Sequence, residues 1–153
     1  METPSFTFRL ERVRTLRERA EERAREELTA ELRARDEVAD RLQLAADAVH
    51  SARAASRDAV RGRVAATDLL GRQTFIERRE QIRTEVSLDL DRQEAEVAVR
   101  RENLAAAARD RQAIDKLKER QAAEHEAEWA LKIANQLDEL ALAVHRRGGA
   151  VAA

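Results

Sequence analysis

The chain has 153 residues, of which 39% are charged and 3% aromatic, with no cysteine, one proline and four glycines. So few turn-forming residues exclude sandwiches, barrels and βαβ folds, and the missing thiols exclude disulfides and thiolate metal sites. Acidic and basic residues nearly balance, no apolar run could span a bilayer, and the opening residues lack the apolar stretch of a signal peptide. We therefore expect a soluble cytoplasmic protein that binds no nucleic acid and does not insert into membranes.

The first predicted helix covers about residues 6–62, and Ser5 and Thr7 are its candidate N-caps. Apolar residues recur in steps of three and four, which is typical of the narrow seam of a coiled coil. This seam comprises Leu28, Leu32, Ala39, Leu42, Ala46, Val49 and Val60. Three residues are expected to interrupt it, namely Arg35, Arg53 and Ser56.

The predicted turn lies at about residues 63–67. Gly62 can end the first helix with a positive φ, and Thr67 or Asp68 can cap the next one. A turn at Gly71 is the alternative.

A second helix is predicted over about residues 68–147, with Gly148-Gly149 ending it and residues 148–153 as a frayed tail. The first seam of this helix comprises Ile82, Val86, Leu90, Val97, Leu104, Ala107 and Ile114. The expected fold is all-α: one coiled-coil domain over residues 1–153, built as a long antiparallel two-helix hairpin. An uninterrupted parallel homodimer is the alternative, which the glycines at 62 and 71 disfavour.

Two features of the second helix point to interactions. With a turn near residue 65, the helix beyond about Glu124 overhangs the start of the first helix, yet Ala130, Ile133, Leu137, Leu140 and Val144 still form an apolar stripe. A turn at Gly71 would remove most of this overhang. From Asp115 to Glu128 the seam nearly vanishes and its phase changes, which predicts either a solvated face or a contact or hinge region.

No pattern in the sequence carries catalytic chemistry. The three histidines, His50, His125 and His145, lack converging partners for a metal, and no phosphate-binding loop or nucleophile elbow occurs. We therefore expect no enzyme activity, no cofactor and no metal site.

Four segments in order resemble the flagellar type III export protein FliJ family, whose members often begin F-x-F-R-L-x-x-V-L-x-L-R. They are FTFRLERVRTLR at 6–17, DLLGRQTFI at 68–76, KLKER at 116–120 and LDEL at 137–140. The resemblance covers nearly the whole chain.

This resemblance implies a cytoplasmic stalk at the base of the flagellum. It would insert into a hexameric export ATPase, stimulate it, and link it to an FlhA-like export-gate membrane protein and to export chaperones. The implied gate contact is Phe75 and Ile76, with Arg79 one turn later where an apolar residue is expected. The implied ATPase contacts lie near both termini: Arg9, Arg12, Arg17, Lys116, Lys118, Arg120, Trp129, Ile133, Leu137, Leu140 and Val144.

Two other interpretations remain open. The stalk of a virulence type III secretion system obeys the same physics, and a homodimeric coiled-coil scaffold would use the same seams. The stalk interpretation predicts a monomer, or weak self-association through residues 129–144.

Overall fold

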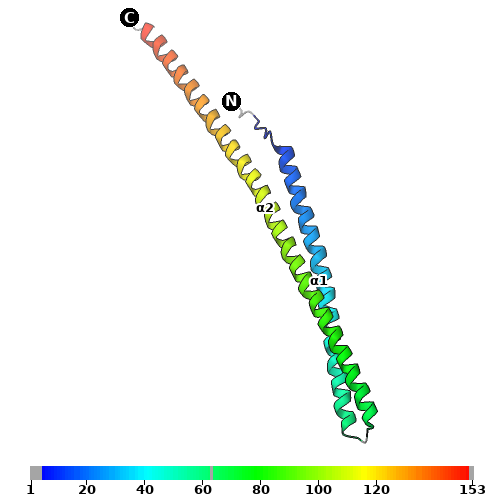
Figure 1. The fold of residues 1–153 in the computed structure, drawn as a ribbon. Coiled ribbons are helices and arrows are strands. Elements are labelled where there is room, and N and C mark those ends of the chain that lie inside the picture. The colour runs from blue at the N-terminus through cyan, green and yellow to red at the C-terminus, as the bar shows by residue number, and fades with distance from the viewer. Residues whose placement is uncertain (1–4, 63, 152–153) are drawn as a thin grey trace. The chain divides into compact units, whose positions relative to one another are not determined.

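The computed structural model describes residues 5–62 and 64–151, with side chains in the second helix as far as Arg146. It contains two helices, α1 (Glu11–Val60, 50 residues) and α2 (Ala66–Val151, 86 residues). The described residues form no strand. Figure 1 shows the two helices joined by a short connection and running side by side near it, in the cyan-to-green part of the chain. The fold is therefore an all-α helical hairpin, as the periodicity predicts.

Helix α1 starts later than the sequence suggests, at residue 11 rather than about residue 6. Leu10 accepts the first helical bond through its carbonyl, from the Arg14 N–H at 2.9 Å, and the Glu11 N–H donates to the Phe8 carbonyl at 3.2 Å. Ser5 and Thr7 precede this turn and are not N-caps, which corrects the prediction. Since Phe8 is buried, its packing accounts for the non-helical entry into α1.

The end of α1 is closed by tight bonds rather than by a left-handed glycine. The Arg61 N–H donates to the Asp58 carbonyl at 3.3 Å, and the Gly62 N–H to the Ala59 carbonyl at 3.1 Å. These i→i−3 bonds satisfy carbonyls that would otherwise be orphaned. Gly62 has no positive φ, so its predicted conformation is wrong.

Helix α2 begins with Ala65 in the cap position, where its carbonyl accepts from the Leu69 N–H at 3.2 Å. Thr67 and Asp68 lie inside the first turn and so do not cap it; Asp68 there interacts favourably with the helix dipole. Gly71 lies inside α2, so the alternative turn is wrong.

The far end of α2 continues through the two glycines at 148 and 149 to Val151, where the sequence suggests an end near residue 147. Glycine lowers helix propensity by about 1 kcal/mol but does not forbid the conformation. Of the predicted frayed tail, residues 152–153 lie outside the described residues.

Contacts divide the chain into two compact units. Unit 1 comprises Met1–Arg19 and Ala108–Ala153, and unit 2 comprises Ala20–Ala107, so each contains part of both helices. A single coiled-coil domain over residues 1–153 stays a prediction.

Unit 2 has a heptad seam in which buried or half-buried residues alternate in steps of three and four. On α1 the seam residues are Glu21, Ala24, Leu28, Glu31, Arg35, Val38, Leu42, Ala45, Val49, Ala52, Ser56 and Ala59. On α2 they are Ile76, Arg79, Val86, Leu90, Gln93, Val97, Arg100, Leu104 and Ala107, with one step of seven between Arg79 and Val86, where Arg83 is exposed. Polar residues therefore take regular seam positions.

Several seam predictions need correction because they follow apolar residues alone. Arg35 and Ser56 belong to the seam rather than interrupting it, whereas Val60 and Ile82 are exposed outside it. Val38, among the most buried residues, is missing from the predicted seam.

The helices of unit 2 run antiparallel, as two ion pairs between them show. Arg53, near the end of α1, pairs with Glu80 near the start of α2, while Glu27 pairs with Arg100 at 2.9 Å. Exposed pairs of this kind contribute about 0–1 kcal/mol each, so seam burial dominates the stability of the unit.

In unit 1 the seam of α2 keeps its phase as far as His125, over most of the segment where the sequence suggests a break. The half-buried residues are Arg111, Ile114, Lys118, Gln121 and His125, again at steps of three and four. Beyond His125 the half-buried Trp129 and Ile133 follow at two successive steps of four, so the phase shifts at the end of the predicted Asp115–Glu128 segment rather than within it. Long polar side chains hold the seam positions there, since their stems pack while their heads reach water.

The heptad phase predicts opposite effects for two neighbouring valines of α2. Val97 is 4% exposed and Val99 is 50% exposed. Val97→Ala should lower the free energy of unfolding by about 1–2 kcal/mol, because two buried methylene equivalents are lost. Val99→Ala, the matched control, should change it by less than about 0.5 kcal/mol. Thermal or urea unfolding followed by circular dichroism measures both; equal effects would contradict the assigned phase.

Candidate functional site

Unit 1 contains a charged cluster that ties the start of α1 to α2. Arg14 is its centre: its Nε donates to Asp115 Oδ1 at 2.8 Å, and its two terminal nitrogens lie 3.1 Å from Glu11 and 2.7 Å from Glu18. Lys118 Nζ donates to Glu11 Oε2 at 2.9 Å. The cluster thus joins the two helices in an antiparallel arrangement.

The same cluster shifts three pKa values. The hydrogen bond from Arg14 holds the pKa of Asp115 below its ordinary value, and nearby Arg111 adds to this. The hydrogen bonds from Lys118 and Arg14 lower the pKa of Glu11. The pKa of Arg14 is raised, chiefly by its bond to Asp115. All three shifts favour the ionised forms, so the cluster stays charged at neutral pH.

Two phenylalanines before α1 pack on the same part of α2. Phe8 is buried, with Lys118 Nζ 5.9 Å from the centre of its ring. The rings of Phe6 and His125 lie 5.8 Å apart between centroids and are inclined by 53°. The F-x-F segment therefore packs against α2, and its contacts reach along that helix to His125.

Beyond His125 the apolar side chains of α2 become increasingly exposed. Trp129 and Ile133 are half-buried, whereas Leu137 and Leu140 are 60% and 61% exposed. Leu131, Leu142 and Val144 are also exposed. In Figure 1 the orange-to-red end of α2 runs past the start of α1, within unit 1. No hydrogen bond, ion pair or ring contact in the described part of unit 1 joins residues 129–146 to α1 or the segment before it.

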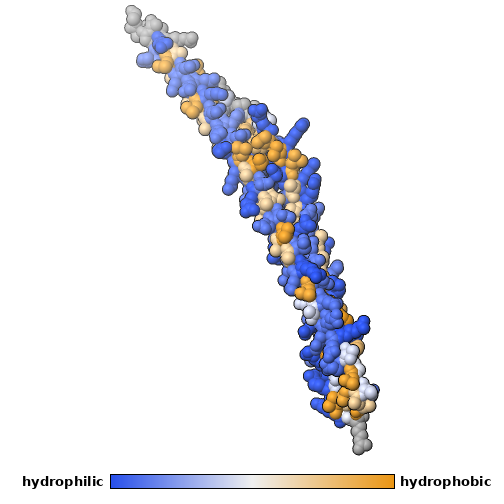
Figure 2. All heavy atoms as spheres, viewed as in Figure 1, coloured by the Kyte–Doolittle hydropathy of each residue, from blue (hydrophilic) through white to orange (hydrophobic). Residues whose placement is uncertain are grey.

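Ile133, Leu137, Leu140 and Val144 recur at steps of four, three and four and so share one face of α2. We call these four residues the apolar end stripe. The surface in Figure 2 is mostly hydrophilic, with orange residues gathered in small separate groups.

The basic residues predicted to contact an ATPase fall into two groups. Arg9, Arg12, Lys116 and Arg120 are exposed. Arg17 and Lys118 instead join the helices, since Arg17 Nη1 donates to Asp110 Oδ2 at 2.8 Å and Lys118 pairs with Glu11. These last two residues have a structural role inside unit 1.

The predicted gate residues lie on two faces of α2 in unit 2. Phe75 is 50% exposed, and the Arg79 guanidinium lies over its ring, 4.9 Å from the centroid. Ile76 is only 8% exposed because it occupies a seam position. Phe75 is therefore the accessible residue of the three, and the half-buried Arg79 extends from the seam over its ring, while Ile76 packs in the seam.

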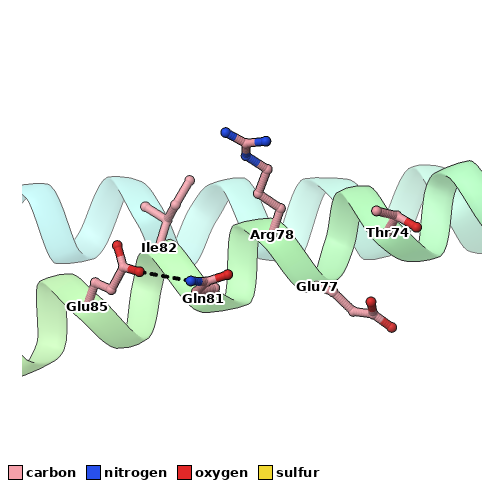
Figure 3. Close-up of a pocket in the computed structure, with 6 residues that line it drawn as sticks. All are labelled: Thr74, Glu77, Arg78, Gln81, Ile82 and Glu85. Atoms are coloured by element: carbon pink, nitrogen blue, oxygen red, sulfur yellow. Dashed lines mark hydrogen bonds between the residues drawn. The ribbon is translucent and has the colours of Figure 1, made fainter.

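A shallow groove that sequence reasoning missed follows Phe75 along α2. Its volume is about 420 Å³, and it is lined by Thr74, Glu77, Arg78, Gln81, Ile82 and Glu85. In Figure 3, Arg78 and Ile82 point to one side of α2 and Glu77 to the other, while Gln81 donates to Glu85 at 3.1 Å. Sequence reasoning missed this groove because the apolar pattern assigns Ile82 to the seam. In the structure Ile82 is exposed and lines the groove instead.

Two further features, a group of metal ligands and a membrane-spanning helix, are absent from the described residues. Within residues 5–62 and 64–146, no three His, Asp or Glu side chains are grouped to hold a metal ion. Among its described residues, neither helix has an apolar stretch long enough to cross a bilayer. The candidate functional surfaces are the apolar end stripe in unit 1 and the exposed Phe75, with Arg79 over its ring, in unit 2.

Comparison with known proteins gives one match. The model of the FliJ family, described as flagellar FliJ protein, matches residues 6–150 of the 153. No curated protein and no solved structure matches the chain.

The charged cluster predicts a loss of stability in acid. Because the pKa values of Asp115 and Glu11 are lowered in the folded chain, their contribution is complete above their ordinary values of 3.8 and 4.5. It is lost as the pH falls through the lowered values. Between pH 6 and pH 3 the melting temperature should therefore fall more for the wild type than for Asp115→Asn. Asp91→Asn, at an exposed position of unit 2, is the control and should follow the wild type. Parallel curves for wild type and Asp115→Asn would contradict the assignment.

Proposed function

The chain belongs to the flagellar FliJ family, and from this premise we propose that it acts as the stalk of the flagellar export ATPase. Its membership supports a role in flagellar protein export, in which the family is a non-catalytic component. In the proposed role, one end of the hairpin inserts into the hexameric ATPase and stimulates it. The chain itself hydrolyses no ATP. The match to the flagellar family favours this system over a virulence secretion system.

The observation that carries the proposal is the apolar end stripe. A helix that exposes several large apolar side chains on one face gains free energy when a partner covers them, about 1.5–3 kcal/mol for each side chain. α1 begins at Glu11 and does not extend alongside this stripe. Within unit 1, therefore, no helix of the described chain covers it. The central opening of a ring of subunits could supply that cover.

A second contact is proposed for the export gate. The exposed Phe75 ring, with the Arg79 guanidinium over it, is an aromatic side chain of the kind that anchors many interfaces. The neighbouring groove with Arg78 and Ile82 extends this surface along α2. We propose that it meets the gate membrane protein, and that export chaperones are further partners. These contacts would hold the chain peripherally at the base of the flagellum.

The ATPase contact is tested by placing charges in the apolar end stripe. Leu137→Glu/Leu140→Glu should abolish stimulation of ATP turnover by the purified export ATPase, because two apolar contacts are lost and two charges would be buried. Helicity should be unchanged, since both side chains are exposed. The control is Leu44→Glu/Leu88→Glu, two exposed leucines of unit 2, which should stimulate like wild type.

Two results would contradict the stalk proposal. One is full stimulation by the Leu137→Glu/Leu140→Glu variant. The other is a wild-type chain that forms a stable dimer and never stimulates the ATPase, which would favour the homodimeric scaffold.

The gate contact is tested at Phe75. Phe75→Ala should weaken binding to the cytoplasmic part of the gate protein by at least about fivefold, since truncating an aromatic anchor costs more than about 1 kcal/mol. Binding is measured by titration calorimetry, with Leu88→Ala as the control for loss of an exposed apolar side chain. Because Phe75 lies outside the seam, the melting temperature should barely change. Unchanged affinity would exclude Phe75 from the contact.

A further inference from the structure

The turn end of unit 2 exposes apolar side chains from both helices. Val60, the last residue of α1, is 61% exposed, while Leu69 and Leu70, near the start of α2, are 37% and 69% exposed. In Figure 2, hydrophobic side chains gather at the end of the view where Figure 1 draws the turn. Pairing of the helices leaves all three residues exposed. We call Val60, Leu69 and Leu70 the apolar tip.

Positive charge gathers around the apolar tip. The ion pair between Arg53 and Glu80 joins α1 to α2 at the boundary of this region. Residues 54–79, which lie between them in the sequence, contain six arginines and three carboxylates, in a chain whose net charge is −1. The turn end of the hairpin is thus basic although the chain as a whole is not, and such a surface attracts anionic partners.

The arginines next to the apolar tip are not neutralised by nearby carboxylates. Within the described residues, no ion pair engages Arg57 or Arg72, and both are exposed. Asp58 lies 3.5 Å from Arg61, and Glu77 accepts a hydrogen bond within α2 at 2.9 Å. Arg57 and Arg72 are therefore available to an external anion.

A shallow groove between the two helices combines positive charge with apolar surface. It has a volume of about 310 Å³ and is lined by Arg53, Ser56, Arg57, Val60 and Ile76. A phospholipid offers the matching groups, since its anionic phosphate is attached to apolar chains. Of the two guanidinium groups in the groove, the one of Arg57 has no ion pair to give up.

We infer that the apolar tip docks onto an anionic phospholipid surface. The side chains of the tip lie among the lipid headgroups, and Arg57 and Arg72 pair with lipid phosphates. One such signal holds a protein on a membrane only weakly, whereas apolar contact and positive charge together hold it firmly. The chain lies on the bilayer without crossing it. This contact goes beyond the proposed function, because it requires neither the ATPase nor the gate protein.

An acidic protein surface fits this end of the hairpin less well than a lipid layer does. Arg57 and Arg72 belong to different helices, with the apolar tip between them in the sequence. Gly71, beside Leu70, borders open space, so this side of α2 is not packed against the described chain. Lipid headgroups are mobile and can move to each guanidinium, whereas a folded partner would need carboxylates fixed at each position.

The charge contribution is tested by sedimentation of the purified chain with lipid vesicles. Wild type should bind vesicles containing phosphatidylglycerol but not vesicles of phosphatidylcholine alone, and less at 0.5 M than at 0.05 M salt, since the Debye length shrinks. Arg57→Gln/Arg72→Gln should lower the partition coefficient at least about tenfold. Arg33→Gln/Arg41→Gln is the control, because it removes the same charge from exposed positions of α1 in unit 2 and should bind like wild type.

The apolar contribution is tested at Leu70. Leu70→Ser should lower the partition coefficient at least about fivefold, because apolar area then stays in water. Leu44→Ser, at a leucine that is 68% exposed elsewhere in unit 2, should bind like wild type. Trp129 is the single tryptophan of the chain, so Trp129→Phe/Leu70→Trp carries a reporter at the tip alone. Its emission should shift to the blue on phosphatidylglycerol vesicles, and that of Trp129→Phe/Leu44→Trp should not.

Three results would overturn the inference. The first is that wild type does not bind phosphatidylglycerol vesicles at low salt. The second is that Arg57→Gln/Arg72→Gln binds them as well as wild type does. The third is that Arg57→Gln/Arg72→Gln keeps vesicle binding but loses affinity for the cytoplasmic part of the gate protein, which would assign the surface to a protein. Vesicle binding and ATPase stimulation are separate measurements, so the failure of one leaves the other standing.

Discussion

Two helices that pair with each other share a single seam, and every other face of each helix meets solvent. The few strongly buried apolar residues of the described chain reflect this limit: they are Phe8, Val38, Val49, Ile76 and Val97. Apolar side chains outside the seam are not buried when the helices pair, so they do not stabilise the hairpin. Apolar residues that continue along one face beyond the paired helices, as in the apolar end stripe, therefore indicate a partner, whereas single exposed leucines such as Leu44 need no explanation.

The seam is also unusually polar for a surface that holds two helices together. Glu21, Arg35 and Gln93 occupy core positions of the heptad, and Arg100 reaches from a core position to Glu27. Gln93 Oε1 is buried without a hydrogen-bond partner in the described structure. Polar core residues lower the stability of a coiled coil but help to fix which residues face each other, because a shifted register would leave them unmatched. Of the residues named here, Arg100 shows this match, since a shifted register would break its ion pair with Glu27.

The fold could be predicted from the sequence because helix propensity and the three-four spacing agree over most of the chain. The details that failed depend on polar residues. Reading apolar residues alone placed Val60 and Ile82 in the seam, and it treated Arg35 as an interruption. The start of α1 failed for a different reason, since the tertiary packing of Phe8 outweighed local capping signals. The candidate surfaces were only half predictable. The apolar end stripe follows from the spacing of apolar residues. The sequence does not show, however, that Arg12 is exposed while Arg17 bonds to Asp110, because this difference depends on which face of α1 meets α2.

The ion pairs between the helices differ greatly in how much chain they enclose. Arg53 and Glu80 are 27 residues apart in sequence, whereas Glu11 and Lys118 are 107 apart. Ion pairs between residues that are close in sequence lose the least conformational entropy on forming. Pairing of the helices is therefore expected to begin beside the turn and to proceed from there along the helices. The last pairs to close are the first to open in local fluctuations. In this chain they are the pairs of unit 1, the unit that also carries the apolar end stripe, so a partner there would meet the part of the hairpin that separates most readily.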